Sequence, residues 1–159
     1  MKNEAATTAI NYKALKVSSS AFENNGMIPI KYTCDGADIN PPLDIEHIPV
    51  EAKCLVLIVE DPGAVPKTRV HWLAWNIPVT HHLKENEIHG VQGINDSNEQ
   101  HYNGPCPPSG IHQYFFKIYA LNNLLDLPES ANKQSLEIAM SDCIIGFGEL
   151  AGLYETKSG

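Results

Sequence analysis

The chain has few basic residues. Its 159 residues include 11 lysines and arginines against 19 aspartates and glutamates, which gives a formal net charge of -8 at pH 7. Duplex nucleic acid and anionic membrane surfaces both require a concentrated basic face, which these scattered cations do not supply. The sequence therefore argues against both as partners, and an anionic ligand would have to be captured locally.

Long apolar runs are also missing. The longest, Cys54–Val59, is far shorter than the roughly 20 residues that a helix needs to span a bilayer. Residues 1–10 contain one lysine but no apolar segment of the kind found in a secretory signal. We therefore expect a cytoplasmic protein, with residues 1–13 as an N-terminal extension and residues 14–156 as a single domain.

Motifs of the common nucleotide, zinc-protease and serine-hydrolase classes are absent: the sequence has no GxGxxG, Walker, HExxH or GxSxG pattern. Its four cysteines show neither CxxC pairing nor zinc-like spacing, so we expect no metal and no cofactor. Cys54 and Cys143 lie among apolar residues and are expected to be small buried hydrophobes. Cys34 and Cys106 lie in loops beside glycine or proline.

Short β-rich segments dominate the rest of the chain. The nearly continuous apolar run Leu55–Glu60 predicts a central strand buried on both faces. Further strands are expected at 70–77 and 114–121, with weaker candidates at 14–18, 27–30 and 149–154. Eleven prolines and eleven glycines between such strands favour a mostly β sandwich with long excursions.

One segment, from Ser130 to about Asp142, predicts a helix. We expect it to start at Ser130 or Glu129 and to contact the core through apolar residues, namely Leu136, Ile138, Ala139 and Met140. The polar stretch 81–103 is long enough to be a functional loop. The aromatic stripes Trp72/Trp75 and Phe115/Phe116/Tyr119 are interpreted as core, and the pair His81–His82 as solvated.

The most informative segment is Gly104–Tyr114. Three prolines fix the backbone and remove three N–H donors, which suits a loop that walls a pocket. The segment leads into a strand in which His112 and Tyr114 share one face, because side chains alternate along a strand.

Three polar residues lie at strand ends or in loops beside apolar runs: Asp61, His71 and His112. If these strand ends converge, a carboxylate beside two imidazoles raises the histidine pKa, and the imidazolium groups donate hydrogen bonds to a phosphate or carboxylate. Tyr114 adds a neutral donor. The pattern predicts a small anion receptor in which Asp61 orients and charges a histidine.

Several ordered blocks of sequence identify a family. They are Tyr32-Thr33-Cys34-Asp35-Gly36, Asn40-Pro41-Pro42-Leu43, Glu60-Asp61-Pro62, Val70-His71-Trp72, Asn76-Ile77-Pro78, Gly104-Pro105-Cys106-Pro107-Pro108, His112-Gln113-Tyr114-Phe115-Phe116 and Tyr119-Ala120-Leu121. In this order, over residues 15–154, they resemble the phosphatidylethanolamine-binding protein family, and most of all its bacterial Raf-kinase-inhibitor-like branch.

The resemblance implies a sandwich of two antiparallel β-sheets with a few short helices and a small pocket for phosphate-like anions and phospho-head groups. Carried over by position, the pocket consists of Asp61, His71, His112 and Tyr114, walled by residues 104–110 with Pro105 and Cys106. Eukaryotic members are kinase-pathway regulators, lipid head-group binders or flowering signals, so a kinase is one candidate partner.

The chain departs from the family pattern at several positions. Gly63 replaces an aspartate and Val65 a proline, which moves the next proline to Pro66 and leaves open whether the family's cis peptide is present. Gln113 replaces an arginine, and Ser141-Asp142-Cys143 replaces a glycine-histidine pair.

Three functions follow as hypotheses. The first is a non-enzymatic protein that binds a phosphate, a phosphorylated small molecule or a phosphorylated side chain. The alternative is a cysteine hydrolase with Cys106 as nucleophile, His71 or His112 as base and Asp61 as orienting group. The third is an interaction module that meets a kinase or a second copy of itself, as a homodimer, through Trp75 or the 81–103 loop.

Overall fold

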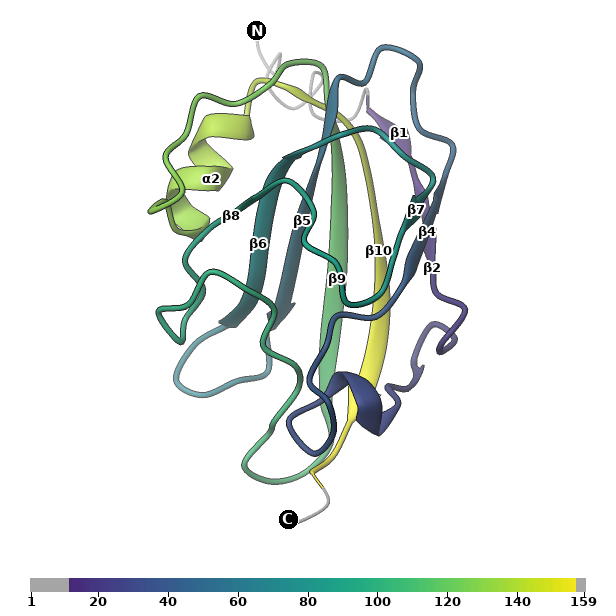
Figure 1. Ribbon diagram of the computed structural model, residues 1–159, viewed down its shortest axis with the longest axis vertical. Coiled ribbons are helices and arrows are strands. Elements are labelled where there is room, and N and C mark those ends of the chain that lie inside the picture. Colours follow the sequence, from purple (N-terminus) through teal and green to yellow (C-terminus); the bar gives the residue numbers. More distant parts are fainter. Residues whose placement is uncertain (1–11, 157–159) are drawn as a thin grey trace, which may run out of the picture.

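The computed structural model describes residues 12–156, which form two β-sheets and one α-helix (Figure 1). The larger sheet has the strand order β1-β10-β9-β5-β6-β8, with β3 paired to β10; the smaller has the order β2-β4-β7. The bounds are β1 Lys13–Ala14, β2 Lys16–Ser18, β3 Gly26–Met27, β4 Leu43–Glu46, β5 Cys54–Asp61, β6 Arg69–Ile77, β7 His82–Leu83, β8 Val91–Gln92, β9 His112–Leu121, β10 Ile144–Tyr154, the 3-10 helix Ile30–Tyr32 and α2 Lys133–Met140.

The predicted β-sandwich is confirmed, with one correction to its pairing. β5, β6, β9 and β10 pair antiparallel, but β1 and β3 both lie parallel to β10, so the larger sheet is mixed. The weak strand predicted at 14–18 is divided between the two sheets as β1 and β2. Residues 27–30 do not form one strand, because β3 ends at Met27 and a 3-10 helix begins at Ile30.

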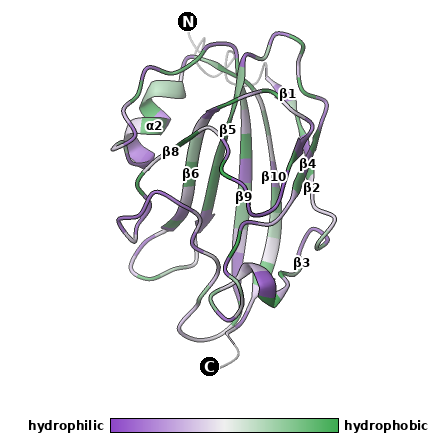
Figure 2. Cartoon of the chain, viewed as in Figure 1, coloured by the Kyte–Doolittle hydropathy of each residue, from purple (hydrophilic) through white to green (hydrophobic). Residues whose placement is uncertain are grey.

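Strand β5 is the centre of the larger sheet, between β9 and β6, and all eight of its residues are buried. Leu55, Leu57 and Val59 enter the core between the two sheets. Val56 and Ile58 enter a second core beneath α2. Burial on both faces explains the unbroken apolar run in the sequence. Figure 2 shows hydrophobic residues concentrated in the strands and hydrophilic ones in the connecting loops.

Helix α2 covers the face of the larger sheet opposite the smaller sheet (Figure 1). It is shorter than predicted, since the side chain of Asn132, rather than Ser130 or Glu129, caps it by accepting from the Ser135 amide. Leu136 and Met140 are buried as predicted, but Ile138 is 68% exposed. The helix has fewer than three turns, so only a narrow stripe of it faces the sheet.

Several expectations about individual side chains can now be settled. Trp75 is fully buried, so it cannot form part of an interaction surface as the third hypothesis supposed. Cys54 is buried and Cys143 only partly so. His82 is exposed and pairs with Asp44 at 2.8 Å. Within residues 12–156 there is no helix long and apolar enough to cross a membrane.

Candidate functional site

The site lies where four strand termini meet at one end of the larger sheet. β5 and β10 end here and β6 and β9 begin here, because neighbouring strands are antiparallel. Figure 1 shows this end at the bottom, near the C-terminus. A cavity of about 550 Å³ opens between the strand ends and the loops, and all four predicted pocket residues line it: Asp61, His71, His112 and Tyr114.

His71 reaches the cavity because of a β-bulge. Val59 pairs with Trp72 and the next residue, Glu60, pairs with Val70, so His71 is an extra residue in β6. Trp72 packs in the core between the sheets and Val70 in the core beneath α2. Strict alternation would place a residue next to Trp72 on the helix side. The bulge instead aims His71 into the site.

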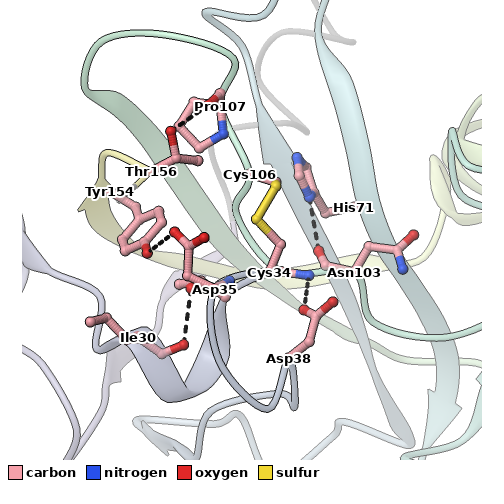
Figure 3. The surroundings of a disulfide bond; sticks show 12 residues. Ile30, Cys34, Asp35, Asp38, His71, Asn103, Cys106, Pro107, Tyr154 and Thr156 are labelled. Atoms are coloured by element: carbon pink, nitrogen blue, oxygen red, sulfur yellow. Dashed lines mark hydrogen bonds between the residues drawn. A yellow bond between two sulfur atoms is a disulfide. The ribbon is translucent and has the colours of Figure 1, made fainter. Parts of the chain in front are cut away.

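The His71 ring is held in one orientation. Its Nδ1 lies 2.8 Å from the backbone oxygen of Asn103 (Figure 3). Because a carbonyl only accepts, Nδ1 carries the proton, and in the neutral ring Nε2 has a free lone pair. Burial lowers the pKa of His71 from its usual value of 6.5 and outweighs the opposing effects of the Asn103 carbonyl and Asp61. Asp61 acts on this pKa in the expected direction, but the prediction of a raised pKa is wrong for His71 because burial has the larger effect.

The carboxylate instead pairs with the other histidine. Nδ1 of His112 lies 2.6 Å from Oδ2 of Asp61, and the side chains are 18% and 5% exposed respectively. The other oxygen, Oδ1, accepts from the Gly63 amide at 2.9 Å. Both oxygens of this nearly buried carboxylate therefore have N–H donors. His112 itself lines the cavity.

Tyr114 lies between the two imidazoles. Its ring meets His71 edge-on at a centroid distance of 5.4 Å and stacks on His112 at 6.4 Å. Only 1% of the residue is exposed, and burial, aided by the charge of Asp61, raises the pKa of its hydroxyl. Tyr114 is therefore a neutral phenol at physiological pH and can donate a hydrogen bond.

The proline loop forms one wall, as predicted, but a disulfide fixes it. Cys106 is bonded to Cys34, with a Cα–Cα distance of 5.5 Å (Figure 3). Further bonds tie the same loops: the Cys34 amide donates to the Pro105 oxygen and the Gly104 amide to Asp38. Pro105 is buried behind the wall and does not line the cavity, unlike Cys106, Pro107 and Pro108.

The disulfide removes the basis of the hydrolase hypothesis in this state of the protein. A cysteine nucleophile acts as a thiolate, and the sulfur of Cys106 is already bonded to that of Cys34. The free cysteines are Cys54 and Cys143, and neither lines the cavity. Nor do residues 12–156 contain a group of three or more histidine, cysteine, aspartate or glutamate side chains that could hold a metal ion.

Two contributors to the site were not found from the sequence. Arg69, at the first position of β6, lines the cavity and donates to Ser97 Oγ at 2.8 Å. Asn95, only 3% exposed, donates to the backbone oxygen of His71 and to Oδ1 of Asn103. Asn95 thereby fixes both the strand that bears His71 and the residue whose carbonyl orients its ring.

The departures from the family pattern have simple structural outcomes. The Val65–Pro66 peptide bond is cis, so the cis bond is present at the displaced proline. A Cβ on Gly63 would meet only Asp61 Oδ1, at 3.5 Å. Gln113 donates to Asn25 and lies on the face of β9 opposite His112.

Comparisons with known proteins agree with this architecture. Residues 18–155 match the family model described as phosphatidylethanolamine-binding protein. A UPF0098 protein of Pyrococcus horikoshii is 50% identical over 155 residues, which cover 91% of this chain and 78% of the relative. A UPF0098 protein of Chlamydia trachomatis is 43% identical over 148 residues, covering 89% and 99%.

Two solved structures are similar in fold. The crystal structure of a phosphatidylethanolamine-binding protein homologue from Chlamydia trachomatis has a TM-score of 0.87 and 41% identity, covering 91% of this chain and 99% of that one. Escherichia coli YbcL has a TM-score of 0.83 and 24% identity, covering 90% and 99%, and shows likeness of fold alone. The chain therefore belongs to the phosphatidylethanolamine-binding protein family.

Proposed function

We propose that the protein binds a phosphate-like anion in the cavity at the strand ends, and that binding rather than turnover is its activity. The observation that supports this most is the pair of oriented imidazoles. His112 is held by Asp61, and His71 by the Asn103 carbonyl, each through Nδ1. The Nε2 atom of each ring has no partner among the described residues, so both remain available to a ligand.

Proton uptake accompanies anion binding in this arrangement. Neutral His71 offers a lone pair at Nε2, so it accepts from a ligand that brings its own proton, such as a phosphate monoanion, or it binds a proton and then donates. In both routes the complex contains one proton more than the free site and a phosphate dianion together, either on the phosphate or on His71. Tyr114 donates in either case. Affinity for phosphate should therefore rise as the pH falls towards 6 and below.

The finer identity of the ligand is part of the proposal. A phosphorylated small molecule, a lipid head group and a phosphorylated side chain share the phosphate chemistry that the two imidazoles recognise. Regulation of a kinase through a phosphorylated side chain, and homodimerisation, stay predictions. Titration with inorganic phosphate, O-phosphorylethanolamine and a phosphoserine peptide separates these sources.

The central experiment is calorimetric titration with inorganic phosphate at pH 6, combined with NMR of the histidine side chains. We expect wild-type binding to be lost in His71→Ala and in His112→Ala. His82→Ala is a matched control, because His82 also pairs with an aspartate, Asp44, but both side chains are exposed and lie outside the cavity. If the wild type shows neither heat nor histidine shifts, the proposal is wrong.

The cellular location also remains a prediction. Disulfides persist chiefly in oxidising compartments, so the Cys34–Cys106 bond weighs against the cytoplasmic location expected from the sequence. Trapping thiols in intact cells with a mass-tagged alkylating reagent distinguishes a cytoplasmic location from an oxidising compartment. A cytoplasmic protein in a reducing cell would gain tags at Cys34 and Cys106.

A further inference from the structure

A second, smaller cavity adjoins the anion pocket. It has a volume of about 270 Å³ and is lined by residues 64–69, which join β5 to β6, together with Asp96. Ala64, Val65 and Arg69 line both cavities. The two cavities are therefore neighbours that share these three residues as lining.

Arg69 lies at this junction with most of its donors unused. Arg69 is exposed; its Nη2 donates to Ser97 Oγ at 2.8 Å, and no carboxylate within residues 12–156 forms an ion pair with it. A guanidinium has five N–H donors in a planar fork that suits a carboxylate or phosphate. A guanidinium without a counterion beside a cavity is available to an anionic group.

The balance of charge differs between the two cavities. The first has two carboxylates, Asp38 and Asp61, against Arg69. The second has two cations, Lys67 and Arg69, against Asp96. The Asp96 carboxylate is already engaged, because its Oδ2 accepts from the Val70 amide at 2.7 Å. The second cavity is therefore the more favourable of the two for an additional negative charge.

We propose that the second cavity is a subsite for a second acidic group on the ligand, recognised by Lys67 and Arg69. This inference rests on the proposed function, in which a phosphate occupies the first cavity. The ligand is then a phosphorylated small molecule with a carboxylate or a second phosphate. A phosphomonoester with an amine, such as O-phosphorylethanolamine, places a cation beside two cations and is disfavoured.

Three ligands with the same phosphate test the subsite. Ethyl phosphate has no second charged group, 2-phosphoglycolate has a carboxylate, and O-phosphorylethanolamine has an ammonium group. Calorimetry at pH 6.5 and constant ionic strength should show that phosphoglycolate binds about tenfold more tightly than ethyl phosphate, the effect of one charge-assisted hydrogen bond. O-phosphorylethanolamine should bind more weakly than ethyl phosphate.

Variants assign the preference to the two cations. The ratio of the phosphoglycolate and ethyl phosphate affinities should fall towards one in Lys67→Ala, in Arg69→Ala and in the double variant. Lys53→Ala is the control, because Lys53 is exposed and lines neither cavity, and it should retain the wild-type ratio.

Two failures are distinguishable. If ethyl phosphate binds but phosphoglycolate has no advantage, or keeps its advantage in the double variant, the subsite is wrong and the proposed function stands. If no phosphate compound binds to the wild type, the proposed function fails and the subsite fails with it.

Discussion

Nδ1 of His112 lies 2.6 Å from Oδ2 of Asp61, whose other oxygen holds the Gly63 amide. The carboxylate thus orients the imidazole and at the same time fixes the turn that follows β5. Both roles depend on its charge, since hydrogen bonds to a charged acceptor are stronger than those between neutral groups.

Replacement of this carboxylate should therefore weaken binding. In Asp61→Asn the neutral amide holds the Nδ1 of His112 less strongly than the carboxylate does, and we expect phosphate affinity to fall about tenfold, as for loss of one charge-assisted hydrogen bond. Calorimetry at pH 6 measures the change. Tighter binding by the variant would contradict the prediction and show that Asp61 mainly repels the anion.

The lowered pKa of His71 predicts how stability depends on pH. The unfolded chain, with a histidine pKa of about 6.5, takes up a proton before the folded protein does. The contribution of His71 to the free energy of unfolding is therefore present above pH 6.5 and is lost as the pH falls below it. Urea unfolding from pH 8 to pH 5 should show a smaller decline in His71→Gln than in the wild type.

The same experiment has an internal control. Asn122→Gln changes a side chain that does not titrate, at an exposed position, and should keep the wild-type decline below pH 6.5. Equal curves for wild type and His71→Gln would mean that His71 takes up its proton equally readily in the folded and unfolded states.

Reduction of the disulfide should destabilise the protein. Cys34 and Cys106 are 72 residues apart in sequence, and a cross-link closing a loop of this length lowers the entropy of the unfolded chain by an amount equivalent to about 4 kcal/mol. Urea unfolding with and without a phosphine reductant measures the loss. The stability of the double variant Cys34→Ser/Cys106→Ser should not change with the reductant. If it does change, the reductant acts on a group other than this disulfide.

Removal of the buried Asn95 amide should affect both stability and binding. Its oxygen accepts from the Ser97 and Glu99 amides, and its nitrogen donates to the His71 and His101 oxygens and to Asn103. Asn95→Ala leaves several of these groups unsatisfied, so we expect a loss of about 1–3 kcal/mol. Asn122→Ala, at an exposed position, should have little effect.

The binding readout separates a positioning role from a structural one. If Asn95 positions His71 through Asn103, phosphate affinity in Asn95→Ala should fall even at temperatures where the variant is fully folded. Unchanged affinity would show that Asn95 stabilises the loop without orienting the ring.

Much of the architecture could be predicted because the pattern of apolar residues within a single segment indicates which of its faces are buried. The two-sided burial of β5 required an unbroken apolar run, and the alternation in β9 placed His112 and Tyr114 on one face. The first residue of α2 was less predictable. Asn132, Ser130 and Glu129 are all plausible N-caps from the local sequence, and only the structure shows that Asn132 is the cap.

The parts that could not be predicted depend on contacts between distant segments. The bulge at His71 exists only in the register of β6 against β5. The disulfide requires two loops 72 residues apart to meet. Arg69 was missed because a cation at the start of a strand has the same local pattern whether it faces bulk solvent or a cavity.

The extra residue in β6 has a consequence for recognising this site in other chains. A histidine at this position is not sufficient, because the number of residues between the β5–β6 loop and Trp72 decides whether its ring faces the cavity. A relative that keeps the histidine but lacks the inserted position would turn it towards the helix. A sequence search for this pocket should therefore require the same number of residues at the bulge, because a histidine in the aligned position does not by itself place the ring in the cavity.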